Sequence, residues 1–137
     1  MRRITFIAAI CLLFSFNAFA QNQFTYEREV IDGMSAAMEK FSQSMEEYNS
    51  SGDIVKAVKE LNTALKDLAP KIREVGEKYP DWGDNPPAEL ESSMERFLKA
   101  SEKFSTESMP ALFNYANAHS EDEALMEEIT RMGEILQ

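Results

Sequence analysis

Cysteine, histidine and glycine are scarce in this 137-residue chain, and each scarcity argues against a class of function. The single cysteine, Cys11, rules out an intrachain disulfide and a zinc site built on several thiolates. The single histidine, His119, leaves no two-histidine zinc motif and no partner for a serine nucleophile. Five glycines form no phosphate-binding loop. We therefore expect no enzymatic activity and no metal centre, although a site built from carboxylates alone stays open.

Long apolar runs are also absent, except at the N-terminus. Arg2 and Arg3 precede an apolar stretch over residues 4–16, and small residues occupy the −3 and −1 positions of a cleavage site after Ala20. Residues 1–20 are therefore predicted to be a cleaved signal peptide, with an N-terminal membrane anchor as the alternative. Cleavage removes Cys11 and leaves residues 21–137 as a periplasmic or secreted protein without a transmembrane segment.

The expected mature chain has an excess of acidic residues. Removing Arg2 and Arg3 leaves 12 of the 14 basic residues against 24 acidic ones, a net charge of −12. Such a charge disfavours nucleic acids and anionic membrane surfaces, and it favours basic partners. The simplest interpretation is that the charged residues form solvated helix faces.

Apolar residues recur at alternating steps of three and four in the first two segments, a pattern typical of nearly parallel packed helices. The first segment, at about 24–49, carries Ile31, Met34, Met38, Phe41, Met45 and Tyr48. The second, at about 54–79, carries Ile54, Val58, Leu61, Leu65, Leu68, Ile72, Val75 and Tyr79. Gly52 is predicted to end the first helix and Asp53 to cap the second. The stripe continues across Pro70, which favours a kink over an end.

Two further helices are predicted after a proline-rich loop at residues 80–87. The third, at 86–118, carries Leu90, Met94, Phe97, Leu98, Phe104, Leu112, Phe113 and Ala116, and Pro110 predicts a kink or break there. Ser120 and Glu123 form a capping box for the fourth, at 120–136. No segment alternates with period two, so no sheet is expected.

These segments predict an all-α protein. Four amphipathic helices bury their stripes best as an antiparallel four-helix bundle in up-down-up-down order, formed by residues 21–137 as one domain. The narrow stripes are also typical of coiled coils, so a homodimer is an alternative to a monomer. The mature chain has no thiol, so its stability must come from the apolar core.

The organisation is similar to that of cytochrome b562-type periplasmic haem bundles, which also have a signal peptide, a short first loop and a long proline-containing middle loop. That resemblance implies haem ligation by a methionine on the first helix, matched by Met34, and by a late histidine, which has no match because the last helix offers only Met132 there. Met38 lies one turn from Met34. We expect core packing for all three methionines and no cofactor; a haem- or metal-binding bundle that uses these core methionines is the alternative.

Trp82 is the residue that packing explains least. It lies in the polar loop at 80–87, close to Tyr79 and Pro80. It is expected either to close the end of the bundle or, together with Tyr79, to contact a partner, because tryptophan is enriched at binding hot spots. We therefore predict a non-enzymatic binding or structural interaction protein of the cell envelope, with protein partners.

Overall fold

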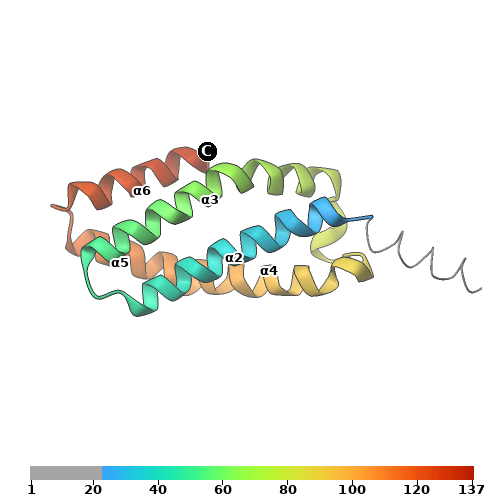
Figure 1. The fold of residues 1–137 in the computed structure, drawn as a ribbon, viewed down its shortest axis with the longest axis horizontal. Coiled ribbons are helices and arrows are strands. Elements are labelled where there is room, and N and C mark those ends of the chain that lie inside the picture. Colours follow the sequence, from blue (N-terminus) through green and yellow to red (C-terminus); the bar gives the residue numbers. More distant parts are fainter. Residues whose placement is uncertain (1–22) are drawn as a thin grey trace, which may run out of the picture.

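The computed structural model describes residues 23–137, and the predicted signal peptide lies outside them. The helices are α2 (Thr25–Glu47), α3 (Ser51–Lys78), η1 (Pro80–Gly83), η2 (Ala88–Leu90), α4 (Glu91–Lys103), η3 (Phe104–Ser108), α5 (Met109–Ala118) and α6 (Glu123–Ile135). Because α4, η3 and α5 join without a break, the described residues form four long helical segments and no strand (Figure 1). The prediction of an all-α protein is confirmed.

The start of α3 differs from the prediction. Ser50, and not Asp53, caps the helix: its hydroxyl accepts a hydrogen bond from the Asp53 amide, and the Asp53 carboxylate accepts from the amides of Asn49 and Ser50. These hydrogen bonds lower the pKa of Asp53. A reciprocal capping box satisfies more backbone amides than a single cap, so the helix begins before Gly52. From there α3 continues through Pro70 to Lys78.

The third segment is continuous through Pro110. Proline has no amide to donate to the carbonyl four residues earlier, and its ring crowds that turn. The chain responds with a wider π-helical turn, η3, in which the Met109 amide donates to the Phe104 carbonyl. Ser108 in this turn is buried and donates a 2.7 Å hydrogen bond to the Ser42 hydroxyl of α2. The predicted irregularity is therefore a π turn just before the proline.

The start of α6 also differs from the prediction. Asp122 caps this helix by accepting a hydrogen bond from the Leu125 amide, and Ser120 lies in the preceding turn. Asp122 also accepts from the Ser51 hydroxyl, which lowers its pKa together with the Leu125 amide bond. This contact places the first residues of α3 and α6 at the same end of the molecule.

The helices pack along their lengths. Helix α2 lies between α3 and α4, and α6 lies against α3. The buried hydrophobic cluster draws on every long helix and consists of Met34, Met38, Phe41, Met45, Ile54, Ala57, Val58, Leu61, Leu65, Ala100, Leu112, Ala116, Leu125 and Met132. Most residues of the predicted stripes therefore lie in the core or pack against it, but the prediction is wrong for Tyr48, Leu98 and Phe113, which are exposed. Within the described residues, no helix is long and apolar enough to cross a membrane.

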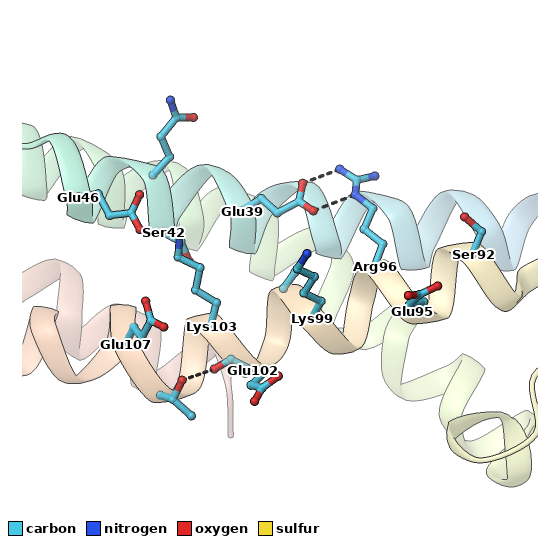
Figure 2. Close-up of a pocket in the computed structure, with 13 residues that line it drawn as sticks. Glu39, Ser42, Glu46, Ser92, Glu95, Arg96, Lys99, Glu102, Lys103 and Glu107 are labelled. Carbon is cyan, nitrogen blue, oxygen red and sulfur yellow. Dashed lines mark hydrogen bonds and ion pairs between the residues drawn. The ribbon is translucent and has the colours of Figure 1, made fainter.

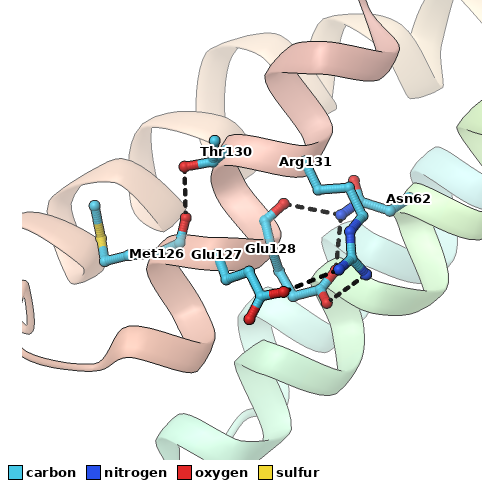
Figure 3. A network of polar contacts seen from close by, with 6 residues as sticks. All are labelled: Asn62, Met126, Glu127, Glu128, Thr130 and Arg131. Carbon is cyan, nitrogen blue, oxygen red and sulfur yellow. Dashed lines mark hydrogen bonds and ion pairs between the residues drawn. The ribbon is translucent and has the colours of Figure 1, made fainter.

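A buried polar network fixes α6 on α3 (Figure 3). The Asn62 amide donates to the backbone carbonyl of Glu128 at 2.9 Å and to its carboxylate at 3.0 Å. Arg131 donates to the same carboxylate at 3.0 Å. Because a carboxylate is costly to bury without partners, this network specifies where α6 sits along α3.

Helix α6 is too short to cover the whole bundle. It has 13 residues against 28 in α3, and the C-terminus lies beside the middle of α3 (Figure 1). One end of the molecule therefore has four helices, whereas the end that carries the proline-rich loop has only α2, α3 and α4.

Candidate functional site

An apolar groove opens where α6 stops. Its floor is Ile31 of α2, and its walls come from α3 and from α4 with the proline-rich loop. The pocket within it has a volume of about 160 Å³ and is lined by Ile31, Ile72, Val75, Gly76, Tyr79, Pro80, Trp82, Gly83, Met94 and Phe97. This volume suits a single large apolar side chain, such as an anchor residue of a partner.

Gly76 leaves the groove open on the α3 side. A Cβ built at this position meets no heavy atom within 4 Å. Gly76 follows Asn62 by 14 residues, a spacing that places both on one face of the helix. Since Asn62 contacts α6, Gly76 faces the position that a longer α6 would occupy.

Aromatic side chains close the far end of the groove. The rings of Trp82 and Tyr79 stack with centroids 3.6 Å apart, and Phe24 meets Trp82 edge-on at 5.2 Å. The Tyr79 hydroxyl donates to the buried Glu27 carboxylate at 3.2 Å, and Lys78 lies 3.6 Å from the same oxygen. Trp82 is half-buried, so it closes the end of the bundle and also lines the groove. The structure thus brings together the two residues predicted to bind a partner.

Leu98 extends the apolar surface along the edge of the groove. It follows Met94 by one helical turn and is 52% exposed, more than any other large hydrophobic residue in the described part of the chain. Leu136 at the end of α6 is exposed to a similar degree. Exposed apolar side chains therefore lie on α4, next to the pocket, and at the end of α6.

The three methionines considered as cofactor ligands lie elsewhere. Met34 and Met38 on α2 and Met132 on α6 are buried in the main hydrophobic cluster. His119 lies at the end of α5, where it stacks on Tyr115 and its Nδ1 is 2.9 Å from the Tyr115 carbonyl oxygen. These methionines therefore pack in the core, and His119 lies at the end of a helix.

A second, larger hollow lies between α2 and α4 (Figure 2). It has a volume of about 780 Å³ and a charged lining. Arg96 donates to both carboxylate oxygens of Glu39 at 2.7 and 2.9 Å, and this pairing lowers the pKa of Glu39. Lys103 pairs with Glu46 at 2.5 Å. Because these charges satisfy each other across the hollow, we assign it to pairing of the two helices.

The sequence predicts Tyr79 and Trp82 as binding residues but not the rest of the groove. Ile72, Met94 and Phe97 belong to core stripes in the sequence pattern, and Gly76 carries no signal. The available signal was length: a fourth segment of about 17 residues cannot cover a second segment of about 26. Comparisons with protein-family models, curated proteins and solved structures found no match to this chain.

Proposed function

We propose that this protein is a non-enzymatic binding protein of the cell envelope that receives a helix of a partner protein in the open groove. The proposal rests on one observation: α6 ends beside the middle of α3 (Figure 1). Ile72, Gly76 and Phe97 are therefore not covered by the fourth helix that covers the rest of the bundle. An apolar pocket lined by Tyr79 and Trp82 contains two of the residue types that are enriched in protein-binding hot spots.

The remaining parts of the proposal concern topology and location. The hydrogen bonds Ser51–Asp122 and Asn62–Glu128 support an up-down-up-down order, because they require α3 and α6 to run in the same direction. Export to the periplasm or outside the cell rests on the sequence of residues 1–20. Partner contact at Tyr79 and Trp82 rests on their place in the groove.

Gly76→Leu tests the groove with little risk to the fold. A side chain at this position enters open space, and leucine favours a helix over glycine by roughly 0.5–1 kcal/mol. We expect the variant to be at least as stable as the wild type by urea unfolding. The leucine introduced at position 76 fills the position of the partner's helix. The amount of partner that the variant captures from envelope extract should therefore fall at least tenfold relative to the wild-type protein, measured by quantitative mass spectrometry.

Gly133→Leu is the matched control. Gly133 is also helical with no heavy atom within 4 Å of its built Cβ, but it lies on the exposed face of α6. This variant should capture the partner as the wild type does. If both variants retain the partner equally, the groove is not the binding surface.

A further inference from the structure

We infer that the helix received by the groove is amphipathic and acidic along one edge, an inference that rests on the proposed function. The occupant must fit four features: the length of the open segment, its apolar floor, the gap at Gly76, and the charges along its edge. The first three describe a helix with an apolar stripe, and the fourth determines its chemistry.

The length of the groove suits a short helix. Lys66 of α3 and Ile135 of α6 line the same hollow, so α6 ends at about this level of α3. From Lys66 to Lys78 the helix rises about 18 Å at 1.5 Å per residue. A partner helix of about 12 residues, or a little over three turns, therefore spans the open segment in line with α6.

A row of basic residues follows the edge of α3. Lys59, Lys66 and Arg73 are spaced by seven residues, so they lie on one side of the helix. Lys59 and Lys66 flank α6, because they line a hollow with Glu128, Arg131 and Ile135. Arg73 carries the row into the open segment. Among residues 23–137, no carboxylate forms an ion pair with any of these three side chains.

Most other basic side chains of the described region form an ion pair or a hydrogen bond within the protein. Lys40, Lys71, Lys78, Arg96, Lys103 and Arg131 each form an ion pair, and Arg28 donates to the Glu89 carbonyl. Lys56 and Lys99 also form no ion pair among the described residues, but only Lys59, Lys66 and Arg73 lie in one row. Seven-residue spacing is also the repeat at which flanking charges of one packed helix meet those of another.

The basic row on α3 and the net charge of the chain favour partners of opposite sign. The net charge of the chain predicts basic partners, but exposed charges farther away than about 8 Å are largely screened at physiological ionic strength. Helical spacing places Lys66 and Arg73 on the side of α3 that a helix in the groove would flank. Its glutamates or aspartates there would gain both ion pairs, whereas lysines would face two like charges.

Two synthetic helices test the inference. Each is a 14-residue, hydrocarbon-stapled peptide without tryptophan, with the same leucine stripe; the residues along its edges are glutamate in one and lysine in the other. Trp82 is the only tryptophan of the chain and lines the groove, so its fluorescence reports binding. With the purified protein at 0.15 M salt, the glutamate peptide should bind at least tenfold more tightly than the lysine peptide.

Charge reversal supplies the decisive comparison. Lys66→Glu combined with Arg73→Glu should reverse the order of the two peptides. Lys56→Glu combined with Lys99→Glu, at positions that line other hollows, should leave it unchanged. Equal binding of both peptides, no fluorescence response to either, or an unchanged order after reversal at 66 and 73 would overturn the inference.

The same preparation separates this inference from its competitors. If the protein alone sediments as a dimer that Leu98→Glu dissociates, a second copy occupies the groove and the inference is wrong. If both peptides bind equally and Gly76→Leu abolishes both, the groove binds helices without regard to charge. In that case the acidic partner is excluded while the proposed function stands.

Discussion

Leu125→Ala is expected to lower the free energy of unfolding by about 3 kcal/mol, within the range measured for buried leucines. Leu125 is fully buried in the first turn of α6. A helix of 13 residues is marginal by itself, so α6 depends on its contacts with the rest of the bundle. The loss should appear as a lower urea midpoint with an unchanged slope, followed by circular dichroism at 222 nm.

Met126→Ala provides the comparison on the same helix. Met126 is the next residue and is 38% exposed, so its truncation should cost less than about 0.5 kcal/mol. Similar costs for the two variants would mean that α6 is not docked on α3 as described. In that case the end of α6 would not bound the groove either.

Trp82→Ala is expected to destabilise the protein by about 2 kcal/mol, less than the truncation of a fully buried tryptophan, because the side chain is only partly buried. The variant loses the stacking contact with Tyr79 and the edge contact with Phe24. Tyr79 also loses the neighbour that holds its hydroxyl toward Glu27. Because the only tryptophan is removed, unfolding is again followed by circular dichroism.

Tyr26→Ala is the control for the loss of an aromatic ring at this end of the molecule. Tyr26 is 46% exposed, and its hydroxyl makes a long hydrogen bond of 3.4 Å to Glu74. We expect a change within about 0.5 kcal/mol. If Trp82→Ala costs no more than this control, Trp82 does not close the end of the bundle.

The helices were predictable from the sequence because their apolar stripes are regular. Met34, Met38, Phe41 and Met45 follow one another at steps of four, three and four, and all four are buried. The caps were less predictable, since several polar residues at each helix start compete for the same amides. Ser50 and Asp122 act as the caps where Asp53 and Ser120 were expected. Tertiary contact contributes to that choice, because Asp122 also bonds Ser51 of α3.

The groove was not predictable from periodicity, because a stripe does not say which part of it stays uncovered. Ile72 and Leu65 occupy equivalent positions in the stripe of α3, seven residues apart, yet only Ile72 lines the open segment. The deciding quantity is where α6 sits along α3. The buried contact between Asn62 and Glu128 determines that level, and it joins residues 66 positions apart in the chain.

The resemblance to haem bundles is a second case in which the sequence pattern leaves a residue's role open. Met34 fits a stripe position that a ligand also fits, and spacing alone does not distinguish the two roles. In the structure Met34 is 7% exposed and lies in the main core cluster. Its burial agrees with the core position that the stripe predicts.

Site-specific photocrosslinking in intact cells tests directly whether a partner binds in the groove. A benzoylphenylalanine at Leu98 lies at the edge of the groove, whereas one at Phe113, which is 46% exposed on α5, lies toward the other end of the molecule. We expect a crosslinked partner from position 98 that disappears in the Gly76→Leu background, and no such product from position 113. A partner that crosslinks at 113 and not at 98 would contradict the proposal.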